Sequence, residues 1–310
     1  MNLRNFRSGI LIIFLALPLT GCLFRSRKVV QTVSRTPLKS ATRDELIRYV
    51  NTQASRITSM QATVDIDTSV GGAKKGRITD YQQIRGFVLA RKPAMLRMIG
   101  LLPLVRTTAF DMVSNGRTFK LWIPPKNRFI VGQDSVETHN IAQPLENIRP
   151  QQIYDALLLP EIDPQKETAV PRDDFETVLD AKGHPVQQPD YVLMVIEKTD
   201  PPYLSREIIF SRSDLLPHRQ FIYNKDGELV TDAHYQGYKD FGGVSFPSQI
   251  EITRPQEEYD ITLTILKLEL NRPLPDDKFV LAQPHGAQVL HLDQPVPQSS
   301  EIRTPHDKGE

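Results

Sequence analysis

Few residues in this 310-residue chain have the types and spacing that catalysis requires. Gly71 and Gly76 are separated as in a phosphate-binding loop, but Arg77 and Ile78 stand where that motif needs Lys and Ser or Thr. Ser245 lies in the sequence GVSFP, which lacks the last glycine of a nucleophile elbow and falls in a predicted strand. These segments therefore predict a hairpin tip and a strand.

Other candidate catalytic or metal-binding groups are scattered. The seven histidines show neither an HExxH motif nor any other metal-ligand spacing. The adjacent acids at 173–174 and 276–277 stand at predicted strand starts, where neighbouring side chains diverge and make poor acid–base pairs. We therefore predict no catalytic residues, no metal, no bound cofactor and no enzymatic activity.

The single cysteine, Cys22, carries the clearest chemical signal. Arg4 and Arg7 precede an apolar run over 10–17, as in an export signal. An uncleaved anchor is the alternative, but the run is shorter than the ~20 apolar residues of a membrane-spanning helix. Residues 19–22, Leu-Thr-Gly-Cys, resemble the lipobox of bacterial lipoprotein precursors. The resemblance implies cleavage before Cys22, and a diacylglycerol and an N-acyl group on that residue.

Cys22 also bears on localisation. An exported chain with one thiol forms no internal disulfide, so its cysteine is free for lipid attachment. Residue 23 is Leu rather than the Asp that favours inner-membrane retention in enterobacterial lipoproteins. By that resemblance, we expect a lipid anchor in the outer membrane, with the protein facing the periplasm.

The charge balance excludes one class of partner. Without residues 1–21, which contain two arginines and no acids, 36 basic residues face 37 acidic ones, so the net charge is about −1. Nucleic-acid binding has no electrostatic support at this charge. The remaining chain is long enough for one large β domain or two small ones.

Composition and periodicity divide the chain into four parts. Residues 1–21 form the signal peptide, 22–40 the lipidated cysteine with a flexible tether, 41–282 the folded domain, and 283–310 a disordered tail rich in Pro, Gln, His and charge. Thr42 and Glu45 have the spacing of a capping box at the start of a first helix. A second helix is predicted over 149–160.

The rest of the folded domain is predicted to be β. Strands are expected near 60–68, 80–91, 94–101, 107–114, 117–123, 127–132, 173–180, 189–197, 205–212, 217–224, 228–238, 244–253 and 258–270. Short connections with turn residues predict antiparallel neighbours. In the last strand the alternation of apolar and polar residues shifts by one position after Ile265. This shift predicts a bulge and a bent sheet.

Alternation along several strands predicts one continuous apolar face. Its members are Phe110, Met112, Phe119, Leu121, Phe129, Val192, Met194 and Ile196. We interpret them as the lining of a lipid-binding cavity, although the sequence leaves open whether they enclose a cavity or a filled core.

An apolar loop interrupts the turn pattern. Leu101, Leu102 and Leu104 lie in the sequence LLPLV between two predicted strands, where Gly, Asn or Asp is usual. Two interpretations are open: the end of a buried strand, or a protruding tip that contacts a membrane or a ligand.

The order of these features resembles the family of lipoprotein carriers and receptors typified by LolA and LolB. The resembling segments, between about residues 59 and 281, are Arg91-Lys92-Pro93 with Leu96-Arg97, Asn115-Gly116-x-Thr118 with Leu121-Trp122 and Pro124, Gly242-Gly243-x-x-Phe246-Pro247, and Asn271-x-x-Leu274 with Asp277 and Phe279.

The resemblance, closer to the lipidated receptor type, implies a mainly β fold. This fold is an unclosed half-barrel of about eleven antiparallel strands, with helices lidding its concave face. It also implies membrane lipid, lipoprotein acyl chains or a periplasmic carrier protein as partners. In the receptor, a leucine in a Pro-Leu loop helps deliver cargo, and Leu104 is at the matching place, although Val105 follows where the receptor has glycine. The alternative is an envelope assembly lipoprotein of the same fold that binds a protein.

Overall fold

The computed structural model describes residues 37–74, 76–134, 149–179 and 182–292. Glu176–Gln188, the end of one β-hairpin, belong to a unit distinct from the main one, which comprises Thr36–Phe175 and Pro189–Glu310. The signal peptide and Cys22 lie outside the described residues.

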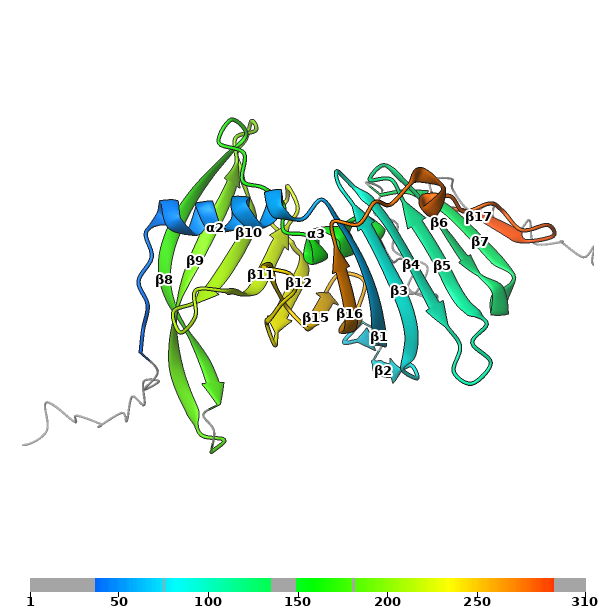
Figure 1. The fold of residues 1–310 in the computed structure, drawn as a ribbon, viewed down its shortest axis with the longest axis horizontal. Helices are drawn as coiled ribbons and strands as arrows, with labels where there is room; N and C mark the ends of the chain where they lie inside the picture. Colours follow the sequence, from blue (N-terminus) through cyan, green and yellow to red (C-terminus); the bar gives the residue numbers. More distant parts are fainter. Residues whose placement is uncertain (1–36, 75, 135–148, 180–181, 293–310) are drawn as a thin grey trace, which may run out of the picture. The chain divides into compact units, whose positions relative to one another are not determined.

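The described elements are mainly strands (Figure 1). The helices are α2 (Arg43–Arg56) and α3 (Pro150–Leu157), with short 3-10 turns η2 (Pro124–Lys126) and η4 (Asp276–Phe279). The strands are β1 (Ser59–Gly72), β2 (Arg77–Asp80), β3 (Ile84–Arg91), β4 (Met95–Leu101), β5 (Thr108–Ser114), β6 (Thr118–Ile123), β7 (Arg128–Gln133), β8 (Glu167–Leu179), β9 (Pro185–Glu197), β10 (Tyr203–Ser211), β11 (Pro217–Tyr223), β12 (Leu229–Gln236), β13 (Lys239–Asp240), β14 (Ser245–Phe246), β15 (Gln249–Arg254), β16 (Tyr259–Leu270) and β17 (Gln288–His291).

One large sheet contains nearly all of these strands. Its order is β17-β7-β6-β5-β4-β3-β1-β16-β15-β12-β11-β10-β9-β8, and β2 pairs with β1 beside this path. From β7 to β9 along this order all neighbours are antiparallel, whereas β17 is parallel to β7. The two ends of the sheet do not pair, so it is unclosed. The predicted fold class is therefore confirmed. The described sheet has 15 strands rather than about eleven, partly because β2 and the tail strand β17 add to it.

A bulge bends the sheet where β1 pairs with β16. Thr63 pairs with Lys267 and Val64 with Ile265, so Leu266 is an extra residue on β16. An extra residue reverses which face the following side chains occupy and increases the local twist. The bulge expected after Ile265 is confirmed.

Helix α2 covers one part of the sheet. Thr42 and Glu45 form the predicted capping box, in which the Thr42 backbone N donates to Glu45 Oε2 at 2.7 Å. Leu46 and Val50 of the helix are buried with Leu193 of β9 and other apolar residues of β8 and β10. Side chains of the helix consequently fill this part of the face. In Figure 1, α2 crosses over β9 and β10.

Helix α3 covers the middle of the same face. It contacts β4, β5 and β15, and Ile153, Ala156 and Leu157 are buried in the main hydrophobic core. Pro150 occupies the first turn of α3, where a missing N–H costs no hydrogen bond.

The C-terminal segment after β16 covers the other face of β4 to β7. Arg97 donates to the Lys278 carbonyl at 2.9 Å, and Lys120 donates to the Leu281 carbonyl at 3.3 Å. Gln288–His291 then form β17 beside β7. The prediction of disorder from residue 283 is wrong for this strand, because backbone pairing to the open edge of β7 compensates for its few apolar side chains. The prediction of a flexible tether over 22–40 likewise extends too far, because the backbone N of Lys39 donates to the Arg212 carbonyl at 2.7 Å.

Candidate functional site

A pocket of about 290 Å³ lies on the helix-covered face of the main unit, over β16, β1 and β3 to β6. It is lined by Ile66, Thr68, Tyr81, Gln82, Ile84, Met98, Leu102, Pro103, Ala109, Phe110, Met112, Leu121, Ile123, Ile153 and Ile261. None of these lining residues is charged, and most are aliphatic or aromatic. Such a wall suits an apolar ligand, because it offers few groups that need a hydrogen bond.

The pocket has a closed and an open end. Met112 and Ile153 are 2% and 1% exposed, so α3 and the middle of β5 close one end. Tyr81 is 47% exposed and lies with Gln82 and Pro103 in the loops before β3 and after β4. A ligand would therefore enter between these two loops and extend toward α3.

Two glycines lie beneath side chains that line the pocket. Gly86 of β3 and Gly100 of β4 face each other, and Gly100 also pairs with Phe110 of β5. A Cβ on Gly100 would clash with the Phe110 ring and lie 2.6 Å from Ile84 Cδ1. The missing side chain thus lets Phe110 and Ile84 lie flat over the strand.

Gly100→Ala is expected to push Phe110 into the pocket. We expect the free energy of unfolding to fall by about 1 to 3 kcal/mol through overpacking, and apolar ligands to bind more weakly. Urea unfolding and a titration with a fluorescent fatty acid measure the two effects. Unchanged stability together with unchanged affinity would show that Gly100 does not support the pocket lining in this way.

Four of the predicted lining residues share the expected face. Phe110, Met112 and Leu121 line the pocket. Phe119 belongs to the same core, but the Arg149 guanidinium lies 5.4 Å from its ring centroid in a cation–π contact. Phe119 is therefore part of a filled region beside the pocket.

The prediction for Phe129 is wrong. Leu121 pairs with Ile130, and Trp122 pairs with Phe129, so Phe129 lies on the opposite face. There it packs with Val113 and Leu281 under the C-terminal segment. The segment 129–131 is uniformly apolar, so alternation could not indicate which residue faces the helices.

The prediction for Val192, Met194 and Ile196 is wrong for the same reason. Leu193 and Val195 pack against α2, and successive residues of a strand alternate between faces. Val192, Met194 and Ile196 therefore lie on the face away from the helix. Residues 191–196 are all apolar, so alternation along the sequence could not indicate which of them face the helix.

The loop after β4 projects from the sheet. Leu101 ends β4 and Leu102 lines the pocket, whereas Leu104 is 101% exposed with a positive φ of 67°. Leu102 N donates to the Thr107 carbonyl at 2.8 Å, which closes the loop. Of the two interpretations, the exposed tip is the one found, while membrane contact stays a prediction.

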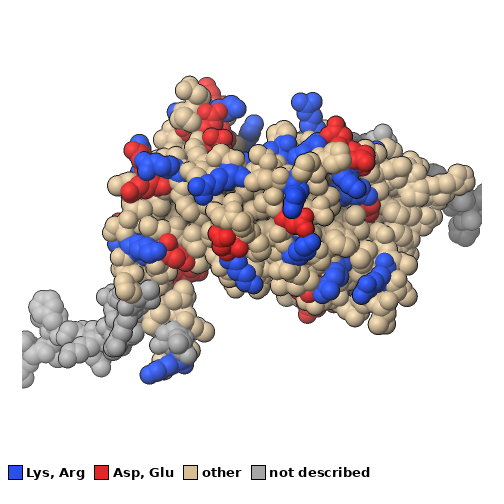
Figure 2. Space-filling view, viewed as in Figure 1, with Lys and Arg blue, Asp and Glu red and all other residues tan. Residues whose placement is uncertain are grey.

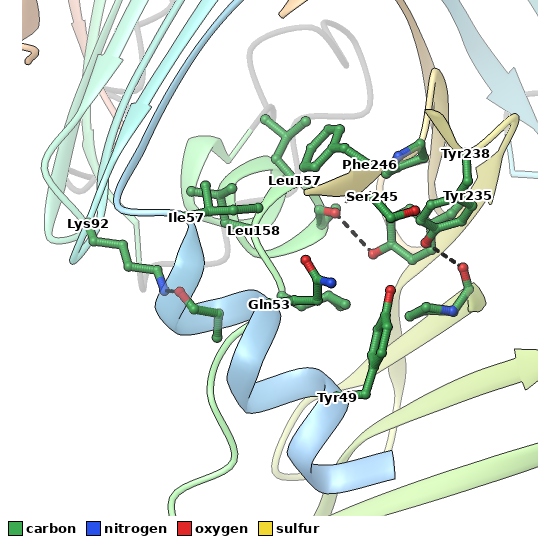
Figure 3. Close-up of a pocket in the computed structure, with 15 residues that line it drawn as sticks. Tyr49, Gln53, Ile57, Lys92, Leu157, Leu158, Tyr235, Tyr238, Ser245 and Phe246 are labelled. Carbon is green, nitrogen blue, oxygen red and sulfur yellow. Dashed lines mark hydrogen bonds between the residues drawn. The ribbon is translucent and has the colours of Figure 1, made fainter. Parts of the chain in front are cut away.

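A second, much smaller pocket of about 40 Å³ lies between α2, α3 and the β12 to β14 region (Figure 3). Tyr235 donates to the Ala156 carbonyl at 3.0 Å, and Tyr238 donates to the Pro217 carbonyl at 2.6 Å. Ser245 borders this pocket, but no histidine or carboxylate is among its lining residues. The space admits little more than a few water molecules at ~10–15 Å³ each.

Charges outside the pocket are mixed in sign. On the face shown in Figure 2, basic and acidic side chains are interspersed, with no continuous basic surface. Within the described ranges, no three His, Cys, Asp or Glu side chains are arranged to hold a metal ion. Across those same ranges, no helix is both long and apolar enough to cross a membrane.

Several pocket residues were missed by the sequence analysis. Ile66, Ile84, Met98, Ala109 and Ile153 come from five different elements. The glycines at 86 and 100 were the available signal, because an isolated glycine inside a strand marks a close approach.

Comparisons with known proteins support the fold but assign no activity. Residues 168–283, under half of the chain, match a family model described as an uncharacterized protein. No curated protein matches the sequence. A solved DUF1329 family protein from Desulfovibrio piger is similar over 77% of this chain and 95% of its own, with 14% identity and a TM-score of 0.50. At that identity, the likeness concerns the fold alone.

Two further solved structures are similar at a TM-score of 0.45 each. A LolA superfamily protein from Nitrosomonas europaea has 17% identity over 76% of this chain and 97% of its own. A putative outer membrane lipoprotein-sorting protein domain from Vibrio parahaemolyticus has 14% identity over 77% of this chain and 97% of its own.

Proposed function

We propose that this protein is a non-enzymatic, membrane-anchored acceptor of acyl chains in the bacterial envelope, acting in lipid transfer or lipoprotein localisation. The observation that carries the proposal is the apolar pocket of about 290 Å³ beside α3. The sequence around Cys22 adds the anchor, with diacylglycerol and an N-acyl group that hold the protein at the outer membrane.

The chemistry of the pocket favours acyl chains. Moving a chain from a bilayer into an apolar pocket exchanges one dry environment for another, so the transfer has a small net free energy and is reversible. Removing a methylene from water, by contrast, is favourable by ~0.8 kcal/mol. A carrier site needs both properties, because it must hold a chain in water and release it at a membrane.

Native mass spectrometry tests the proposal with the Cys22→Ala protein, which carries no anchor of its own. Incubation with a fatty acid, a phospholipid or a lipopeptide is expected to give a one-to-one adduct with at least one of them. The absence of an adduct with every one of these ligands would contradict the proposal.

Leu104→Glu is expected to weaken attachment to lipid vesicles about fivefold, or ~1 kcal/mol, because a carboxylate at the exposed tip resists transfer out of water. Binding of a soluble fatty acid should be unchanged, since Leu104 does not line the pocket. Both effects are measured in the Cys22→Ala protein. Vesicle sedimentation measures the attachment to vesicles, and fluorescence titration measures the binding of the fatty acid. Val280→Glu is the matched control, because Val280 is also exposed, at 63%, and lies on the C-terminal segment.

A protein partner is the second candidate, favoured by the same exposed apolar tip at Leu104 and Val105. In that case, Leu104→Glu would abolish capture of the partner while leaving vesicle attachment intact.

A further inference from the structure

We propose that an extended segment of a protein partner adds a strand to the free edge of β16, in a groove beside the β13–β14 hairpin. The groove has a volume of about 430 Å³ and shares no lining residue with the apolar pocket of about 290 Å³. The proposal therefore goes beyond the proposed function and does not depend on it. Three features of the groove carry it: unpaired backbone groups, an apolar wall and an exposed guanidinium.

The free edge arises because β16 continues beyond its neighbour β15. Their last paired residues are Thr264 and Gln249, after which Ile265 N donates to the Ser248 carbonyl at 2.8 Å. Residues 267–270 keep β1 on one side. On their other side, no strand among the described residues pairs with them. Such an edge is a template for pairing with another chain.

The hydrogen bonds to β1 show which backbone groups face the free side. Asn271 N donates to the Ser59 carbonyl at 2.8 Å. Residues of an antiparallel pair alternate between bonded and non-bonded positions, so Glu269 also bonds to β1, whereas Leu268 and Leu270 face away from it. In the part of the chain that the structure describes, nothing bonds the backbone N–H and C=O of these two leucines. The edge thus offers two donors and two acceptors to an incoming strand.

The side chains beside this edge form an apolar wall. Leu268 is opposite Ala62 of the main core, so Leu268 and Leu270 lie on the helix-covered face. Phe241 and Val244, from the turn between β13 and β14, also line the groove. Phe241 and the two leucines are only partly buried, so a ligand can contact them. A strand paired with β16 would place alternate apolar side chains against this wall.

A peptide suits the groove better than an acyl chain does. An acyl chain over the edge would shield the free N–H and C=O groups of Leu268 and Leu270 from water without bonding them, which is unfavourable for each group. An extended peptide has its own backbone N–H and C=O groups at the matching spacing and can bond all four. The groove therefore favours a strand over a lipid.

An exposed guanidinium adds a preference for acidic peptides. Arg272 lines the groove with 71% of its side chain exposed, and its Nε lies 3.9 Å from Glu269 Oε2. Glu269 is also paired with Lys267 at 2.6 Å. Two cations and one carboxylate leave a net charge of +1 at this edge. An Asp or Glu beside the apolar residues of the partner strand would complement that charge.

Heptapeptides selected from a phage-displayed random library against the Cys22→Ala protein are the probes. Amide hydrogen exchange, followed by NMR, should be fast at Leu268 and Leu270 in the free protein and slow at Glu269. A saturating peptide should slow exchange at both leucines about tenfold or more. N-methylation of the peptide at the alternate residues that face β16 should weaken binding about fivefold each, the effect of one hydrogen bond. Methylation of the intervening residues should change it little.

Arg272→Glu provides the second readout, because it reverses a surface charge and leaves the apolar wall intact. It should weaken binding of an acidic heptapeptide about fivefold at low salt and less at high salt. Arg43→Glu is the matched control, since Arg43 is 56% exposed on α2 and does not line the groove. Equal binding by the two variants would overturn the acidic preference.

Three results would overturn the proposal itself. Leu268 and Leu270 amides that are already protected in the free protein would mean that another part of this chain, or a second copy, occupies the edge. Protection of these amides by a fatty acid would assign the groove to lipid. Failure to select any peptide that protects them would leave the edge to solvent alone. Fatty-acid binding in the pocket of about 290 Å³ is measured separately, so the proposed function can stand or fall without this one.

Discussion

Ala109→Phe is expected to lower the affinity for a single-chain fatty acid at least tenfold, with little change in folding. Ala109 lines the pocket from β5 and is only partly buried, so the added ring can extend into empty volume. Displacing two methylenes of the ligand costs ~1.6 kcal/mol, which exceeds the ~1.4 kcal/mol of a tenfold change. Fluorescence titration of the Cys22→Ala protein with and without the substitution measures the effect.

Ala73→Phe is the matched control for that experiment. Ala73 is exposed in the turn between β1 and β2 and does not line the pocket. The Ala73→Phe variant adds the same ring to the same residue type, so its affinity for the fatty acid should equal that of the parent protein. If Ala109→Phe bound the fatty acid as tightly as Ala73→Phe does, the ligand would have to lie elsewhere.

Glu257→Ala is expected to reduce the free energy of unfolding by about 3 to 5 kcal/mol, because it leaves a buried guanidinium without its carboxylate. Arg254 is 0% exposed and donates to Glu257 Oε1 at 2.7 Å and Oε2 at 3.1 Å. Burial also lowers the pKa of Arg149, and the nearby carboxylate of Glu257 partly opposes that shift. Removal of Glu257 would thus leave two guanidinium groups in a poorly hydrated region. Urea unfolding monitored by circular dichroism measures this change in the free energy of unfolding.

Two variants distinguish this explanation from a general effect of truncation. Arg254→Met combined with Glu257→Ala removes both charges and should lose less stability than Glu257→Ala alone. Glu269→Ala removes a carboxylate that pairs with Lys267 at 2.6 Å on the surface, and it should cost only ~0 to 1 kcal/mol. A Glu257→Ala effect as small as that of Glu269→Ala would contradict the importance of the buried pair.

Much of the fold was predictable because most strands alternate or end in turn residues. The capping box at Thr42 and the bulge after Ile265 were both readable from local sequence. Strand β17 was not, because its pairing depends on an open edge about 160 residues away in the chain rather than on its own composition.

The pocket was less predictable than the fold. Alternation along β5 and β6 correctly identified three lining residues, Phe110, Met112 and Leu121, because the residues between them are polar or face the other side of the sheet. Phe129 and Met194 were misplaced because their strands are apolar on both faces, one under the C-terminal segment and the other in the continuous run 191–196. Ile153 and Tyr81 join the pocket only through tertiary contacts, which no periodicity encodes.

The most direct test of acyl-chain binding in this pocket uses a fatty acid with a photoreactive diazirine on its terminal carbon. After irradiation of the Cys22→Ala protein, peptide mapping by mass spectrometry locates the cross-link. The predicted sites are Met112, Leu121 and Ile153, at the closed end beside α3. Cross-links confined to the exposed tip at Leu104, or to the small pocket around Tyr49 and Tyr238, would contradict the account.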